Sequence, residues 1–195
     1  MIKAKFVILR HGETEYNKKH LMTGKADIPL TEIGEEQARE AGALIRNIRF
    51  DKAYSSNLQR AFNTAALALH ASKTQVHLLN ADGTWQIEQR EAIAEIDAGY
   101  FTGRNHKADS EIIKHKRGYD IPLPGGESEK QVVERVQKFF DSEVMPRLKK
   151  GENVLVVAHA GVLRMFEIVG GLQEAPADGG MLLKRKRIPN ATPVV

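Results

Sequence analysis

The sequence predicts an α/β fold, a three-layer sandwich in which a mainly parallel central sheet has helices on both faces. Two continuous apolar runs, Phe6–Leu9 and Val154–Ala158, and the helical patterns between them carry this prediction. Apolar runs without alternation are typical of strands buried on both faces, as in a parallel sheet. Strands and helices alternate along the chain, and this order favours crossover connections with a helix on either side of the sheet.

The elements between the two runs each have a local signal. Apolar residues between 33 and 48 recur at helical spacing after Thr31, which fits an N-cap. A short second strand begins at Ala53, an alanine-rich helix covers 58–69, and a third strand is predicted at 76–79.

The second half of the chain combines an irregular stretch with one long helix. Residues 80–127 are polar and rich in glycine and proline, which predicts a lid or substrate-binding insertion. Ser128 and Gln131 form a capping-box pattern, and apolar residues at helical spacing continue to Val144. A weak β-like tail covers 188–195. The length of 195 residues suits a single domain.

The composition excludes several classes of protein. The chain has no cysteine, which excludes disulfide scaffolds, cysteine-based metal sites and a cysteine nucleophile. A net charge of +4 suits anionic ligands but is far below the basic stripe of a nucleic-acid binder. No run approaches the roughly 18 apolar residues of a membrane span. We expect a cytoplasmic monomer or homodimer with no membrane or nucleic-acid partner.

Two histidines follow the two apolar runs directly. His11 comes after the first run and His159 after the second, and a glycine follows each within two residues. Ligands of open parallel sheets bind outside the carboxyl ends of the strands, so both imidazoles are expected at one site. The alternative is that each histidine only bonds to a nearby carbonyl at a strand end.

Two arginines are placed to bind an anion at the same edge. Arg10 precedes His11, and Arg60 comes early in the helix after the second strand, where free N–H groups already favour anions. The planar guanidinium matches phosphate oxygens with two bonds at once. The alternative for Arg60 is a surface ion pair.

Other chemistries lack their sequence patterns. There is no His-Glu-x-x-His, no phosphate-binding Gly-Lys-Ser/Thr loop, no dinucleotide-binding glycine pattern and no Gly-x-Ser-x-Gly elbow. The remaining histidines are scattered without metal-ligand spacing, so no metal site is predicted. Histidine itself is left as the nucleophile.

The motifs around these residues resemble those of the histidine phosphatase superfamily, which includes the cofactor-dependent phosphoglycerate mutases. Residues 9–14 with Asn17 are similar to its signature, 55–61 to its second arginine motif and 156–161 to its second histidine motif, so the resemblance covers nearly the whole chain. It implies five catalytic residues, namely His11, Glu95, His159, Arg10 and Arg60. It implies six substrate- or phosphate-binding residues, namely Asn17, Thr23, Gly24, Lys116, Arg117 and Ala160.

The acid/base glutamate is identified only through this resemblance. Glu95, four residues before Gly99, matches the family's glutamate, whereas the residues alone leave Glu88 and Glu91 as rivals.

The resemblance also implies a mechanism. A phosphohistidine would form on His11 without a metal or other cofactor, and Glu95 would give and then take a proton. Arg10, Arg60 and His159 would hold the phosphoryl oxygens. The two arginines would lower the pKa of His11 and keep the imidazole neutral, as a nucleophile must be. A mutase would in addition need 2,3-bisphosphoglycerate as a priming phosphate donor.

Phosphatase and mutase are both open within this resemblance. Residues 116–122 resemble the substrate segment of the mutases, whereas 124–128 is a pattern shared with metabolite phosphatases. Ala98 stands in place of a mutase tyrosine, His106 stands near a mutase lysine, and Ala160 with Gly161 replaces their Gly-Asn. We therefore expect hydrolysis of a small phosphorylated metabolite, with a 2,3-bisphosphoglycerate-dependent mutase as the alternative.

A third possibility is a phosphate-binding module without useful turnover. In that case the basic run at 184–187 would be a docking patch, although such a run is more often a solvated strand edge.

Overall fold

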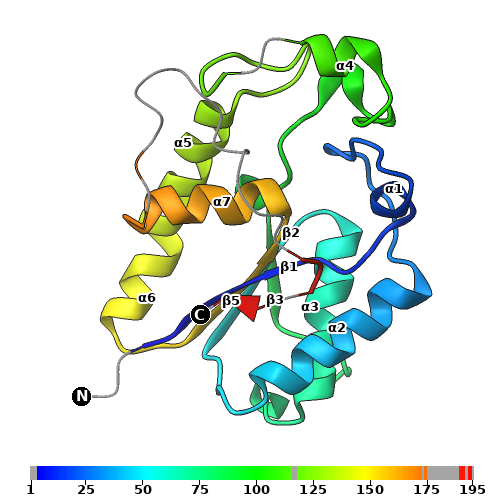
Figure 1. Cartoon of the computed structure of the whole chain (residues 1–195). Helices are drawn as coiled ribbons and strands as arrows, with labels where there is room; N and C mark the ends of the chain where they lie inside the picture. Colours follow the sequence, from blue (N-terminus) through cyan, green and yellow to red (C-terminus); the bar gives the residue numbers. More distant parts are fainter. Residues whose placement is uncertain (1–3, 116–117, 173, 175–188, 192, 195) are drawn as a thin grey trace.

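The computed structural model (Figure 1) describes residues 4–115, 118–172, 174, 189–191 and 193–194. Its sheet has the strand order β3-β2-β4-β1-β5, in which all neighbours run parallel except the pair of β1 and β5. The strands are β1 (Phe6–Arg10), β2 (Lys52–Ser56), β3 (Ile87–Arg90), β4 (Val154–Ala158) and β5 (Pro193–Val194).

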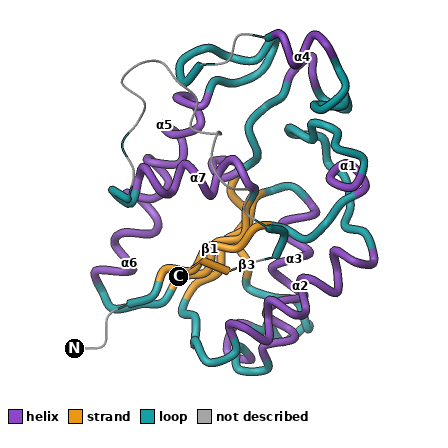
Figure 2. Tube along the Cα trace, viewed as in Figure 1, coloured by secondary structure: helices purple, strands orange, loops and turns teal. Residues whose placement is uncertain are grey.

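Helices cover both faces of this sheet (Figure 2), which confirms the predicted α/β sandwich. One face carries α2 (Glu32–Ile45) and α3 (Gln59–Ser72). The opposite face carries α5 (Glu129–Phe139), α6 (Met145–Lys149) and α7 (Ala160–Val169). Two short helices, α1 (Glu15–Lys18) and α4 (Ser110–Lys114), lie beyond the carboxyl ends of the strands.

The neighbouring strands β1 and β4 are apolar except for Arg10, and both of their faces are covered by helices. Val7 and Leu9 of β1 pack in the core beneath α2 and α3, whereas Ile8 packs in the core beneath α5 and α7. Successive side chains of a strand point to opposite faces, so a strand between two helical layers needs apolar residues at every position.

The helix starts follow the predicted capping signals. The Thr31 side chain accepts a bond from the Gly34 N–H, and Ser128 with Gln131 forms a complete capping box. The predicted long helix after Ser128 is α5, which continues through a π-helical turn (Phe140–Val144) into α6.

The predicted third strand is wrong. Residues 76–79 include a 3₁₀ turn (Val76–Leu78), in which Val76 is 69% exposed. The third strand is β3, which lies inside the stretch that the sequence assigns to an insertion and pairs with β2. An edge strand is only half-buried, so it needs no continuous apolar run, and none marks this one.

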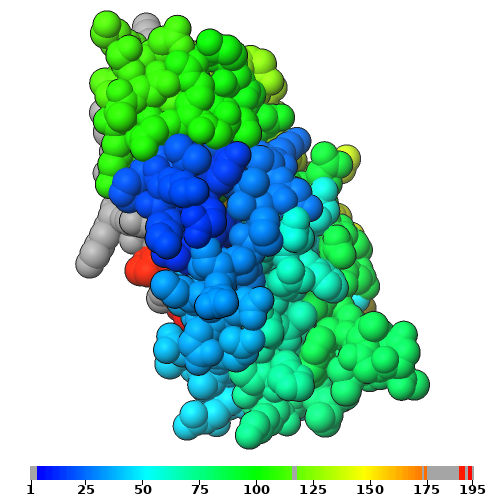
Figure 3. All heavy atoms as spheres, turned by 90° about the vertical axis from the view of Figure 1, so that its right-hand side faces the viewer, coloured from blue at the N-terminus to red at the C-terminus, as the bar shows by residue number. Residues whose placement is uncertain are grey.

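The irregular residues that follow β3 form a cap at the carboxyl edge of the sheet. The cap contains 3₁₀ turns at Glu91–Ile93 and Gly99–Phe101, and Phe101, Ile112 and Leu123 belong to a small core of its own. Residues 103–106 exchange backbone hydrogen bonds with residues 20–22, so the cap and the segment after α1 lie side by side (Figure 3).

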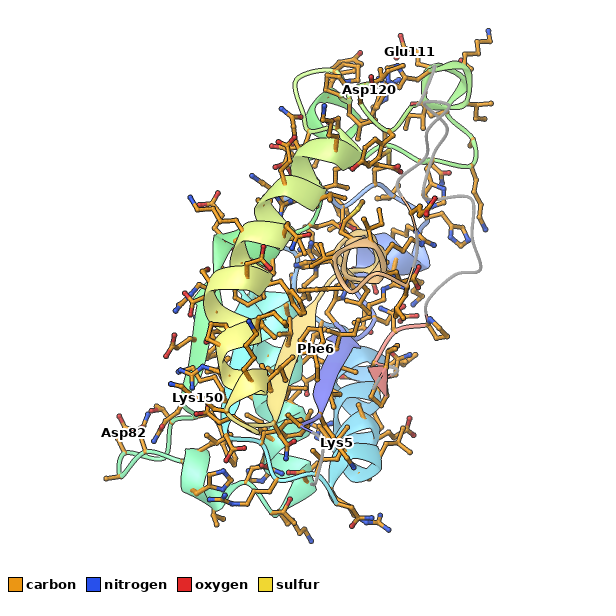
Figure 4. All side chains as sticks on the ribbon, turned by 90° about the vertical axis from the view of Figure 1, so that its left-hand side faces the viewer. Lys5, Phe6, Asp82, Glu111, Asp120 and Lys150 are labelled. Carbon is orange, nitrogen blue, oxygen red and sulfur yellow. The ribbon has the colours of Figure 1, made fainter. Side chains whose placement is uncertain are left out.

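The cap lies at the far end of the molecule from the amino ends of the strands. Figure 4 shows Glu111 and Asp120 of the cap at one end, and Lys5 and Lys150, which precede β1 and β4, toward the other. Within the described residues, no helix is both long and apolar enough to cross a membrane.

Candidate active site

The strand register brings the two predicted histidines together. Arg10 of β1 lies opposite Ala158 of β4, and the His11 N–H continues the ladder with a 2.9 Å bond to the Ala158 carbonyl. The residues that follow Arg10 and Ala158 are His11 and His159, so both histidines lie at the carboxyl edge of the sheet. The ring centroids of His11 and His159 are 5.1 Å apart, and both residues are buried.

The hydrogen bonds of His11 fix its tautomer. Its Nδ1 lies 2.6 Å from the Gly12 carbonyl oxygen, which can only accept a bond, so Nδ1 carries the proton. Nε2 of the neutral ring is then left with its lone pair. A neutral imidazole whose Nε2 lone pair is free is the form that can attack phosphorus or accept a proton.

Burial and neighbouring charge keep both rings neutral. Desolvation, followed by the charges of Arg60 and Arg10, holds the pKa of His11 well below its usual value. Desolvation, Arg60 and His11 do the same for the pKa of His159. Neither ring nitrogen of His159 has a hydrogen-bond partner among the described residues. An anionic ligand could therefore accept a hydrogen bond from the N–H of the His159 ring.

The two arginines take different places around the histidines. Arg10 is 5% exposed and lines the cleft in front of His11. Arg60 is fully buried and does not line the cleft, and its guanidinium donates to the carbonyls of Gly24 and Ala26 at 3.0 and 2.7 Å. The surface ion pair considered for Arg60 is therefore wrong.

Arg60 remains charged in this position. Desolvation lowers its pKa to about 10, against the opposing effects of Glu95 and Asp27, so the guanidinium is protonated at neutral pH. Its Nε is buried and has no hydrogen-bond partner among the described residues.

Of the three rival glutamates, only Glu95 reaches the cleft. Its carboxylate accepts bonds from the Ile96 N–H at 3.0 Å and the Gly161 N–H at 3.4 Å. Glu88 on β3 pairs instead with Lys52 and Arg90, and the exposed Glu91 pairs with Lys25.

Gly161 allows Glu95 to approach the first turn of α7. A Cβ atom at position 161 would lie 2.4 Å from Glu95 Oε1, well inside van der Waals contact. Gly12 serves a similar purpose behind His11, because a Cβ there would lie 2.2 Å from the Gly34 carbonyl oxygen. The Gly12 N–H is then held by the Thr64 hydroxyl at 3.0 Å.

A cleft of about 180 Å³ opens in front of these residues. The predicted binding residues Asn17, Thr23, Gly24 and Ala160 line this cleft. The wall consists of Arg10, His11, Asn17, Met22, Thr23, Gly24, Glu95, Ile96, Ala98, Ala160, Gly161 and Arg164. The predicted residues Lys116 and Arg117, and the basic run at 184–187, lie outside the described residues.

The site contains two further residues that were not predicted from the sequence, one in the cleft wall and one in contact with His11. Arg164 lines the wall from α7, four residues after Ala160, and this helical spacing was a usable signal. Asn190 donates through Nδ2 to the His11 carbonyl at 2.9 Å and to Asn17 Oδ1 at 3.2 Å. No local pattern in the tail indicates that contact.

A second hollow of about 440 Å³ adjoins the cleft and carries further basic side chains. We call it the basic annex. It shares Arg10, Asn17, Ala160 and Arg164 with the cleft and adds His20, Leu21, His106 and Lys107. Lys107 Nζ lies 3.0 Å from His20 Nε2, so these two groups already form one polar cluster.

The fold and the site together define an α/β protein with a cleft at the carboxyl edge of its sheet, where two buried histidines, two arginines and one carboxylate lie in or behind the wall. The chain belongs to the histidine phosphatase superfamily, because the sequence model of branch 1 of that family matches residues 6–176. It is thus one of the phosphoglycerate mutase-like histidine phosphatases, as the motifs indicated.

Curated relatives agree with this family. A 2,3-bisphosphoglycerate-dependent phosphoglycerate mutase of Parvibaculum lavamentivorans is 42% identical over 166 residues, which are 81% of this chain and 75% of the relative. A protein of the same name from Methylobacterium is 40% identical over 172 residues, which are 84% and 78% of the two chains.

Solved structures share the fold. The phosphoglycerate mutase of Bacillus anthracis superposes with a TM-score of 0.75 at 26% identity, over 97% of this chain and 86% of that one. A mycobacterial glucosyl-3-phosphoglycerate phosphatase superposes with a TM-score of 0.73 at 24% identity, over 96% and 90%. The second likeness shows the fold alone.

Proposed function

We propose that this chain hydrolyses a small phosphomonoester through a phosphohistidine formed on His11. The neutral His11 ring carries the proposal, because its Nδ1 proton is bound to Gly12 and its Nε2 lone pair is left free beside the cleft. In the first step Nε2 attacks phosphorus, the bond from phosphorus to the ester oxygen breaks, and Glu95 gives a proton to that oxygen.

The second step reverses these roles. Water attacks the phosphorus, Glu95 takes the water proton, and the bond to Nε2 breaks to release phosphate and restore His11. Arg10 holds the phosphoryl oxygens from the cleft wall, whereas His159 and Arg60, which are fully buried and do not line the cleft, support them from behind it. Asn17, Thr23, Gly24 and Ala160 shape the phosphate pocket. In this scheme the arginines supply the positive charge that a metal ion provides elsewhere, so we propose that no metal or other cofactor takes part.

The small side chains around the reacting group favour water as the acceptor. Ala98, Ala160 and Gly161 line the cleft with no polar side-chain atoms, so they have no group to orient a second hydroxyl. A mutase must return the phosphoryl group to a bound hydroxyl while denying water the same path, which requires such contacts and closure.

The basic annex indicates the class of substrate. Arg164 belongs to both hollows, and Lys107 and His20 lie beyond it, so positive charge extends past the reacting phosphate. We infer a substrate that carries a second anionic group, such as a carboxylate or a second phosphate.

The alternative is a 2,3-bisphosphoglycerate-dependent phosphoglycerate mutase. The curated relatives of that name favour it, and so does the annex, because a phosphoglycerate carries a carboxylate besides its phosphate. The bisphosphate would then act as the priming phosphate donor.

One assay separates the two functions. With 3-phosphoglycerate as substrate, released phosphate and the 2-phospho isomer are measured with and without 2,3-bisphosphoglycerate. We expect phosphate release to exceed isomerisation without any priming. Faster isomerisation that depends on the bisphosphate would establish the mutase. No turnover of 3-phosphoglycerate or p-nitrophenyl phosphate would favour a phosphate-binding module.

A further inference from the structure

Glu95 lies in a segment that no helix or strand holds. It follows the 3₁₀ turn Glu91–Ile93 and precedes the next turn, Gly99–Phe101. Among the described residues, its carboxylate accepts hydrogen bonds from the N–H groups of Ile96 and Gly161. The position of the carboxylate must therefore be fixed mainly through its backbone.

An ion pair outside the cleft holds this backbone. Arg135 on α5 donates to the carbonyls of Ala92 at 2.8 Å and Glu95 at 3.3 Å. The same guanidinium makes a two-pronged pair with Glu127, with both N–O distances at 3.0 Å. Glu127 in turn accepts from the Asp97 N–H at 2.9 Å, and its own N–H donates to the Asp97 carbonyl at 3.0 Å.

These bonds reach both sides of Glu95 and tie them to one helix. The side chains of Arg135 and Glu127 are 19% and 20% exposed, so solvent weakens the pair less than it weakens a surface pair. Neither side chain lines the cleft. Any effect on chemistry must act through another residue.

We propose that Arg135 and Glu127 form a clamp that positions Glu95 as the proton donor and acceptor. The inference rests on the proposed function, because it needs Glu95 to be the acid and base. Arg135 and Glu127 are positioning residues in this scheme. Arginine is required at 135 because only its planar fork can bind a carboxylate with two bonds and two carbonyls at the same time.

The test uses the dependence of a general acid on the leaving group. p-Nitrophenolate leaves without a proton, whereas the alkoxide of glycerol 2-phosphate needs one. The rate of His11 phosphorylation is measured for both substrates in single turnovers. Arg135→Lys should slow phosphorylation by glycerol 2-phosphate about 10- to 100-fold, because a displacement near 1 Å costs up to about 100-fold. Phosphorylation by p-nitrophenyl phosphate should change less than about threefold.

Three further variants make the test specific. Glu127→Gln should also slow phosphorylation by glycerol 2-phosphate more than phosphorylation by p-nitrophenyl phosphate. Arg39→Gln, which removes exposed ion pairs between Arg39 and two glutamates on α2, should change neither rate. Glu95→Gln combined with Arg135→Lys should be no slower than Glu95→Gln alone, because residues that act through one group are not additive.

The outcomes separate the inference from the proposed function. If Arg135→Lys and Glu127→Gln slow both substrates equally, the clamp is merely structural and the inference is wrong. If Glu95→Gln is selective for glycerol 2-phosphate but the clamp variants are not, the inference also fails while the function stands. If Glu95→Gln itself shows no selectivity, the proposed acid is wrong.

Discussion

Substitution of Gly161 by alanine should lower the activity without lowering the stability of the protein. The added Cβ would lie 2.4 Å from Glu95 Oε1, and ordinary contact begins at 3.4 Å, so the carboxylate must move by about 1 Å. The displaced atom is the end of a flexible side chain, so the fold can yield there at little cost. A misplacement of this size costs about 100-fold in rate, or about 2.7 kcal/mol of barrier.

The same substitution should not destabilise the protein. Position 161 lies in the first turn of α7, and alanine is favoured over glycine inside a helix by about 0.5–1 kcal/mol. We expect Gly161→Ala to show an unchanged or higher Tm, with phosphate release from 3-phosphoglycerate reduced about 100-fold.

The control variant, Glu95→Asp, has a side chain that is shorter by one methylene group. In a Glu95→Asp background the methyl group of Ala at 161 has room, so the same substitution should cost less than about threefold there. Activity of Gly161→Ala within threefold of the unmodified chain would refute the reasoning. A matched loss of activity and Tm would show that α7, rather than Glu95, had moved.

Three other predictions follow from the site. Brief exposure to substrate should leave an acid-labile, base-stable phosphate on His11, and mass spectrometry that placed it on serine or threonine would contradict the mechanism. Because the folded-state pKa values of His11 and His159 are depressed by burial, the unfolded chain binds more protons just below pH ~6.5. The free energy of unfolding, measured with urea, should therefore decrease as the pH is lowered through that window, by up to about 1.4 kcal/mol per pH unit for each histidine. The decrease should be less steep in His11→Gln. Turnover should survive exhaustive chelation and be inhibited by vanadate, whereas activity that required magnesium would exclude the proposed role of Arg10 and Arg60.

The strand pattern was enough to predict the centre of the site. Apolar runs without alternation marked β1 and β4, and parallel pairing of these strands places His11 next to His159. The failure at β3 has the opposite cause, because an edge strand with half-buried residues has no apolar run to mark it.

Two parts of the site, Glu95 and Asn190, lie in segments without regular structure. The sequence could not choose Glu95 over Glu88 and Glu91, because spacing alone does not show which of three nearby carboxylates reaches the cleft. The contact of Asn190 with the His11 carbonyl likewise joins residues 179 positions apart, and no local pattern reports such a contact.

The central pairing of the sheet has a consequence for folding. β1 pairs with β4, and Phe6 lies opposite Val154, so the first strand described pairs with a parallel partner almost 150 residues further along the chain. Until then the apolar side chains of β1 have no strand beside them, since β2 pairs with β4 and β3. Pairing between residues so far apart slows folding, because a long loop must close first. A growing chain therefore lacks the parallel partner of β1 until β4 has been made.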